Sequence, residues 1–195
     1  MSIVLLGSTS GSCTLQEQAV AGTTTLTLPT FNGTVGLLVS GTAQTAPPAT
    51  PQYFDFTSIP AGVRRITVMF NEVSSSGTSN FLVQLGDSGG IENTGYVSTS
   101  NYTNQASTTG GSNSTAGYLL FNSASSGAAL ISGTYTLVNI SGNTWIGSGV
   151  HKMITTQVIF SGGSKALSDV LTQIRVTTVN GTDTFDAGSI NILYE

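Results

Sequence analysis

Alternation of apolar and polar residues is clearest between residues 53 and 85. In residues 65–70, Ile66, Val68 and Phe70 fall on one face and the intervening residues fall on the other. Successive side chains of a strand point to opposite sides of a sheet, so this spacing predicts a strand with one buried face. The same period returns in residues 81–85 after a short Ser/Gly turn. We expect the two strands to pair as an antiparallel hairpin.

Short apolar runs separated by Gly-rich turns continue to the end of the chain. Further strands are predicted at residues 53–56, 91–97 (broken), 117–121 (central), 134–140, 144–150, 153–160, 171–179 and 187–194. The intervening turns are at residues 141–143, 161–164 and Asn180-Gly181, and one helical turn is expected at 167–171. Strands at this spacing predict an all-β, antiparallel β-sandwich of jelly-roll type.

Residues 99–115 are the longest polar segment, and we expect them to form a loop. Loops of this length in compact domains are usually functional or mobile. Tyr96 and Tyr102 flank its start, with Asn101, Asn104 and Gln105 beside them. Aromatic faces and side-chain amides can together hold a sugar ring, which makes these five residues the candidate receptor or glycan site. The alternative is that Tyr96 packs on the sandwich and Tyr102 anchors the loop.

The N-terminal part of the chain has a different character. Short strands are expected at residues 3–6, 23–28 and 33–39, and none could bury a core alone. Residues 41–51 are rich in Pro, Thr and Ala and carry no charge, as in a stiff, extended linker. We therefore divide the chain into an extended N-terminal segment, residues 1–48, a linker to about residue 51, and a sandwich domain, residues 52–195.

Charged residues make up only 7% of the chain, against roughly a quarter in a typical globular domain. The net charge of −4 leaves too few basic groups for a nucleic-acid partner. No apolar run approaches the roughly 20 residues of a membrane helix, so membrane insertion is not expected. Residues 1–7 have no basic region and their apolar core is too short for a signal peptide, which predicts synthesis in the cytoplasm. The single Cys13 excludes an internal disulfide.

Catalytic and metal-binding patterns are weak. His151 is the only histidine, so a Ser-His-Asp triad would depend on it, and its neighbours favour a strand end or a turn. One His and one Cys do not make a zinc site, and Asp183 and Asp186 lack the spacing of a calcium loop and are read as turn caps. Asp87 and Glu92 could form a glycosidase pair, but a solvated turn is favoured. We expect no catalysis, cofactor or metal, and we place Trp145 in the core.

Residues 7–36 carry a recognisable pattern: a Gly/Ser/Thr-rich opening, a TL pair, the core AGTTTLTLP and a GTV step. This stretch resembles the segment near the start of many tailed-bacteriophage tail-fibre and other virion appendage proteins, and residues 53–100 look more loosely like the distal domains of such fibres. The resemblance implies a virion component, usually a homotrimer, anchored through its N-terminus. The implied docking residues are Ile3, Val4, Leu5, Leu6, Leu26, Leu28, Val35 and Leu37.

The resulting expectation is a structural virion protein that is located in the virion and attaches to the host surface, with surface polysaccharide as a candidate partner. The chain is short and has no repetitive shaft, which leaves tail fibre, head fibre and capsid decoration protein open. A glycan-degrading spike that uses Asp87 or Glu92 is a third, less favoured alternative.

Overall fold

The computed structural model describes residues 2–6, 12–16, 38–46, 51–121, 129–153 and 155–195, and the chain divides into two compact units, Met1–Val35 and Gly36–Glu195. In the first unit, β1 (Ser2–Leu6) pairs antiparallel with β2 (Ser12–Gln16). The strand expected at residues 3–6 is confirmed. Those expected at residues 23–28 and 33–39 lie wholly or mostly outside the described residues.

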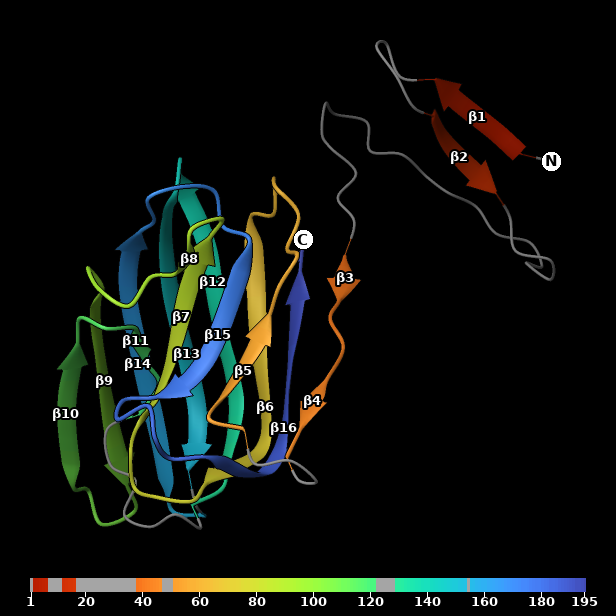
Figure 1. Ribbon diagram of the computed structural model, residues 1–195. Helices are drawn as coiled ribbons and strands as arrows, with labels where there is room; N and C mark the ends of the chain where they lie inside the picture. The colour runs from red at the N-terminus through yellow and green to blue at the C-terminus, as the bar shows by residue number, and fades with distance from the viewer. Residues whose placement is uncertain (1, 7–11, 17–37, 47–50, 122–128, 154) are drawn as a thin grey trace. The chain divides into compact units, whose positions relative to one another are not determined.

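The described residues of the second unit form two antiparallel sheets (Figure 1). The larger sheet has the order β10-β9-β14-β13-β12-β6-β16-β3, with β4 also paired to β16. Its strands are β3 (Val39–Ser40), β4 (Gln44–Thr45), β6 (Arg65–Ser75), β9 (Val97–Asn104), β10 (Thr109–Ser114), β12 (Ile131–Ser141), β13 (Thr144–Met153), β14 (Gln157–Ala166) and β16 (Phe185–Tyr194). No helix occurs in the described residues.

The smaller sheet has the order β11-β7-β15-β5, with β8 paired to β7. Its strands are β5 (Tyr53–Phe56), β7 (Phe81–Asp87), β8 (Gly90–Ile91), β11 (Tyr118–Leu119) and β15 (Gln173–Thr178). The two sheets enclose one apolar core, to which the alternating faces of β6 and β7 contribute. The predicted all-β antiparallel sandwich is therefore confirmed.

The predicted hairpin between residues 65–70 and 81–85 is wrong, although both strands exist. β6 pairs with β12 and β16 in the larger sheet, whereas β7 pairs with β15 and β11 in the smaller one. Residues 76–80 carry the chain from one sheet to the other, held by Ser76 N to Thr184 O (2.8 Å) and Ser79 N to the Asp183 carboxylate (3.0 Å). β6 and β7 show the same alternation because each has an apolar face directed at the core. The two strands face each other across that core and do not lie side by side.

Part of the expected linker belongs to the sandwich. β3 and β4 pair with β16, Gly41 N donates to Ile192 O (2.7 Å), and Ala46 is buried. β6 pairs with one edge of β16, and the uncharged segment that contains β3 and β4 pairs with the other edge. The compact sandwich unit therefore begins at Gly36. The boundary expected from the sequence was later in the chain, near residues 48–51.

Four further predictions in the second unit are corrected. Residues 99–115 form most of the β9–β10 hairpin instead of a loop, and the expected turn at residues 161–164 lies inside β14. The central strand predicted at 117–121 is reduced to β11 at the end of the smaller sheet, buried on both faces. No helical turn forms at 167–171. In contrast, the β12–β13 hairpin and the Asn180-Gly181 turn are confirmed, and Gly142 and Gly181 take the positive φ angles of 51° and 67° there.

Gly163 illustrates why glycines that resemble a turn lie in a strand. A Cβ at Gly163 would lie 2.5 Å from the Val97 carbonyl oxygen and 2.9 Å from the Ser98 Cα, whereas at Gly162 the nearest atom is 3.5 Å away. We expect Gly163→Ala to lower the free energy of unfolding by about 1–3 kcal/mol, because backbone must move. Gly162→Ala should be neutral or stabilising, since alanine restricts the unfolded chain. Urea denaturation of both variants checks this, and equal effects would contradict it.

Candidate functional site

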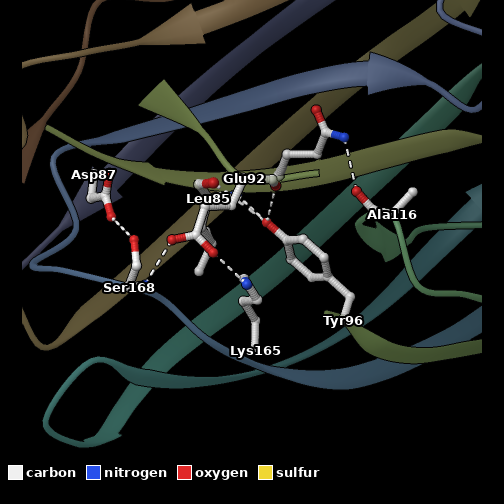
Figure 2. Close-up of polar contacts among 8 residues, drawn as sticks. Leu85, Asp87, Glu92, Tyr96, Ala116, Lys165 and Ser168 are labelled. Atoms are coloured by element: carbon white, nitrogen blue, oxygen red, sulfur yellow. Dashed lines mark hydrogen bonds and ion pairs between the residues drawn. The ribbon is translucent and has the colours of Figure 1, made fainter. Parts of the chain in front are cut away.

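The five residues predicted to bind a receptor or glycan do not converge. Tyr96 is 1% exposed, and its hydroxyl accepts a hydrogen bond from Leu85 N (2.7 Å) and donates one to Glu92 O (2.9 Å) (Figure 2). Asn101 is exposed on the outer face of β9, whereas Tyr102 is half-buried against the core. Strand alternation separates these neighbours onto opposite faces. The alternative interpretation of Tyr96, packing within the sandwich, describes what the structure shows.

The remaining two residues shape the β9–β10 turn. The Asn104 side-chain oxygen accepts hydrogen bonds from Ala106 N (3.0 Å) and Thr108 N (2.9 Å). Gln105 is exposed, and its backbone N–H donates to Thr156 O (3.2 Å). Asn104 is therefore engaged in holding the turn, as Asn side chains commonly are.

The two candidate carboxylates belong to a polar network rather than a solvated turn (Figure 2). Asp87 is 4% exposed and accepts hydrogen bonds from Ser168 Oγ (2.6 Å) and Gly89 N (2.8 Å). Glu92 accepts from Ser168 N (2.7 Å) and forms an ion pair with the buried Lys165. The favoured solvated-turn interpretation is corrected, because the connection after β14 lies against these carboxylates.

The environment of this network lowers the pKa of both carboxyl groups. For Asp87, the Ser168 and Gly89 hydrogen bonds lower the pKa more than burial raises it. For Glu92, burial raises the pKa, but the Lys165 and Ser168 contacts together outweigh it. Glycoside hydrolysis requires one carboxyl group with a raised pKa, to act as the acid. The arrangement thus favours a structural role, in which the network fastens residues 165–168 to the β7–β8 hairpin.

His151 lies within β13 rather than at a strand end, and its side chain is fully buried. Its ring stacks on Tyr135 (centroids 6.3 Å apart) and meets the edge of Phe70, and its Nε2 lies 3.3 Å from Ser161 Oγ. Within the described residues no carboxylate orients this imidazole. Burial lowers the pKa of His151 to about 4. The side chain is a neutral component of the core.

Other candidate chemistry is similarly accounted for. Asp183 accepts hydrogen bonds from Ser79 N and Asn180 Nδ2 (2.7 Å), which confirms its role as a turn cap. Trp145 is 3% exposed, as predicted for a core residue. The part of the chain that the structure describes contains no group of three or more metal-ligating side chains and no helix long and apolar enough to cross a membrane.

One cavity was not anticipated from the sequence. It has a volume of about 120 Å³ and lies where the β5–β6 connection, the β12–β13 turn and the β14–β15 connection meet. The polar side chains lining it are Arg64, Asn139 and Asn143, with Trp145 and Leu171 among the apolar ones. The β12–β13 turn beside this cavity was predicted from the sequence, whereas the connection that contains Leu171 was wrongly expected to form a helical turn. No sequence pattern connects residue 64 with residues 139–145.

The outer face of the larger sheet carries an unusual number of exposed apolar side chains. Phe160, Val150 and Ile146 are 52%, 53% and 43% exposed, and Val97 is 73% exposed. The register places Val150 opposite Phe160 and Val138 opposite Ile146, so these side chains form two cross-strand pairs. We call Val97, Val138, Ile146, Val150 and Phe160 the outer apolar face.

The predicted docking residues in the first unit are placed only in part. Ile3 to Leu6 lie in β1, and Leu26, Leu28, Val35 and Leu37 lie outside the described residues. Comparisons of the chain with protein-family models, curated proteins and solved structures return no match. The class that the structure defines is an all-β antiparallel sandwich with a separate N-terminal unit.

Proposed function

We propose that this chain is a structural appendage protein of a tailed-phage virion, which anchors through its N-terminal unit and presents the sandwich for attachment to the host surface. The observation that carries the proposal is the division of the chain between residues 35 and 36. The segment that resembles virion-attachment sequences, residues 7–36, ends at that division. A unit that is distinct from the sandwich can dock on the particle without involving the sandwich itself.

The polar character of the sandwich supports adhesion over catalysis. Three of its buried ionisable groups, His151, Lys165 and Asp87, are held by packing or by partners within the described residues. The chain carries few charges, and its surface offers hydroxyl and amide groups in their place. Such groups suit contact with neutral or weakly charged polysaccharide and with other virion proteins.

The outer apolar face supports contact between copies of the chain, and the resemblance of residues 7–36 to virion appendage segments implies that the copies number three. Exposed apolar patches on soluble proteins commonly mark contact surfaces, and interface cores are depleted in charge. We therefore assign the face to the contact between copies of the chain.

Replacing Phe160 and Ile146 together with lysine should convert the proposed trimer to monomers, because burying lysines without partners opposes association. Val179→Lys is the matched control, because Val179 is 54% exposed but lies beyond β15, away from the outer apolar face. Light scattering of the full-length proteins at micromolar concentration measures the mass. A monomeric parent chain, or equal masses for both variants, would refute the assignment.

Location in the particle tests the proposed function itself. Purified virions of the phage that encodes the chain are labelled with gold-conjugated antibodies raised against the chain and are imaged by electron microscopy. Label on tail appendages supports a fibre, and label over the shell would instead indicate a head fibre or decoration protein. Particles that lack the chain would overturn the proposal.

A further inference from the structure

We propose that the cavity beside Arg64 binds an acidic sugar unit through its carboxylate. The cavity lies at the end of the sandwich formed by the β5–β6, β12–β13 and β14–β15 connections, beside the C-terminal end of β16 (Figure 1, upper end). Asn104 lies opposite Gln157 of β14, and Gln157 lies opposite Met153 of β13. Met153 is at the end of β13 that is farthest from the β12–β13 turn. The cavity is therefore remote from Asn104 and the β9–β10 turn.

Hydrogen bonds between the backbones of these connections fix the cavity walls. Asn139 N donates to Arg64 O (2.8 Å), Leu167 N donates to Asn143 O (3.0 Å), and Arg64 N donates to Glu195 O (2.7 Å). The walls are thus preformed rather than assembled by a ligand. Preformed sites lose less conformational entropy on binding.

The charge of Arg64 is the central observation. The chain has five Lys and Arg residues, and the other four form ion pairs with carboxylates: Arg65 with Glu195, Lys152 with Glu72, Lys165 with Glu92 and Arg175 with Asp55. Among the described residues, Arg64 has no such partner. It lines a cavity in a protein of net charge −4 and provides the positive charge there.

Neighbouring amides orient this guanidinium. Arg64 Nη1 donates to Asn139 Oδ1, and Asn139 Nδ2 in turn donates to Gly142 O (2.8 Å) and Thr144 O (3.2 Å). A guanidinium has five N–H donors in a planar fork, and this bond uses one of them. The remaining donors match the two oxygens of a carboxylate, which arginine binds in bidentate geometry.

The other lining groups distinguish a sugar acid from a bare anion. Asn143 is half-buried and presents an amide suited to hydroxyl groups, and Trp145 and Leu171 supply apolar contact. A cavity of about 120 Å³ admits the carboxylate and adjoining ring edge of a single sugar unit. A single unpaired arginine suits a monoanion, since polyphosphate binding calls for clustered cations. That the sugar belongs to a host polysaccharide rests on the proposed function, whereas carboxylate binding does not.

The sole tryptophan provides a direct measurement. Trp145 lines the cavity, so its fluorescence in the full-length protein reports on this site alone. Titration with glucuronate should change the emission saturably, whereas glucose and acetate at equal concentrations should bind at least about tenfold more weakly, because each lacks one half of the recognition. An equal response to glucose would overturn the carboxylate assignment, and an equal response to acetate would overturn the sugar assignment.

Two adjacent arginines provide matched variants. Arg64→Gln should weaken glucuronate binding by about 10- to 100-fold, the loss expected for a hydrogen-bonded charge. Arg65→Gln should bind normally, because Arg65 pairs with Glu195 and does not line the cavity. Unchanged binding by Arg64→Gln, or no fluorescence response to glucuronate in the parent protein, would refute the site. Either result leaves the virion location untouched, and an absence from particles would leave glucuronate binding untouched.

Discussion

Replacing His151 with phenylalanine should remove most of the pH dependence of stability between about pH 7 and pH 5. His151 is the only histidine, and its folded environment lowers its pKa from 6.5 to about 4. Burial is the cause, because the imidazole lies between Phe70 and Tyr135 with no charged group bonded to it among the described residues. The folded protein therefore holds this side chain neutral.

The sign follows from proton binding. Between its folded and unfolded pKa values, the unfolded chain binds a proton that the folded chain does not, so stability falls as the pH falls from 6.5 toward 4. Each pKa unit corresponds to about 1.4 kcal/mol, so the folded protein should lose about 2 kcal/mol between about pH 7 and pH 5. Below about pH 4 the contribution levels off.

The carboxyl groups do not obscure this window. The pKa values of Glu72, Asp87 and Glu92 are lowered from ordinary values of 4.5, 3.8 and 4.5, so their stabilising contributions are lost only at lower pH. Urea denaturation at several pH values measures the difference between parent and variant. A His151→Phe variant with the same pH slope as the parent would contradict the assignment, whatever its absolute stability.

Strand positions could be predicted from the sequence wherever one face is apolar. Ile66, Val68 and Phe70 alternate with positions that are less buried, and the structure buries all three. The β12–β13 hairpin was found because its turn, Ser141-Gly142-Asn143, separates two alternating runs. Alternation and turn composition are local properties, so they survive without knowledge of the tertiary structure.

Sheet membership could not be predicted in the same way. Alternation shows that a strand has one buried face, but it does not show which strands lie beside it in the sheet. The sequences of β6 and β7 therefore gave no sign that the two strands lie in different sheets. The sequence did not predict β9 as a strand, because Ser98 and Ser100 occupy its buried positions, where apolar residues would be expected. The Gly162-Gly163 pair looked like a turn, but close packing on Val97 and Ser98 requires glycine there.

The site predictions failed for a related reason. Tyr96, Asn101 and Tyr102 were grouped because they are close in sequence, and strand alternation disperses them. The cavity beside Arg64 combines side chains more than 70 positions apart in the chain, an arrangement that only the fold creates. Arg64 is distinguished from the other four basic residues by its lack of an ion-pair partner among the described residues. That difference is visible only once the partners of the other four are known.

Replacing Lys165 with methionine should lower the free energy of unfolding by about 2–4 kcal/mol, because it leaves the Glu92 carboxylate without its cation in a partly buried site. Lys165 is 6% exposed and Glu92 is 21% exposed. The Lys165 Nζ also lies 5.3 Å from the centroid of the Tyr96 ring, so the loss includes this cation–π contact as well as the ion pair with Glu92. Urea denaturation near neutral pH measures the effect.

Two variants sharpen the test. Lys152→Met removes a cation whose pair with Glu72 is exposed (43% and 45%), and it should destabilise the protein clearly less than Lys165→Met does. The double variant Lys165→Met/Glu92→Gln should recover much of the loss, because it removes the uncompensated charge and keeps an acceptor for Ser168 N. Since Ser168 and Leu171 belong to the same connection, Lys165→Met should also weaken glucuronate binding at the Arg64 cavity. Equal losses for Lys165→Met and Lys152→Met would show that the network does not hold this connection in place.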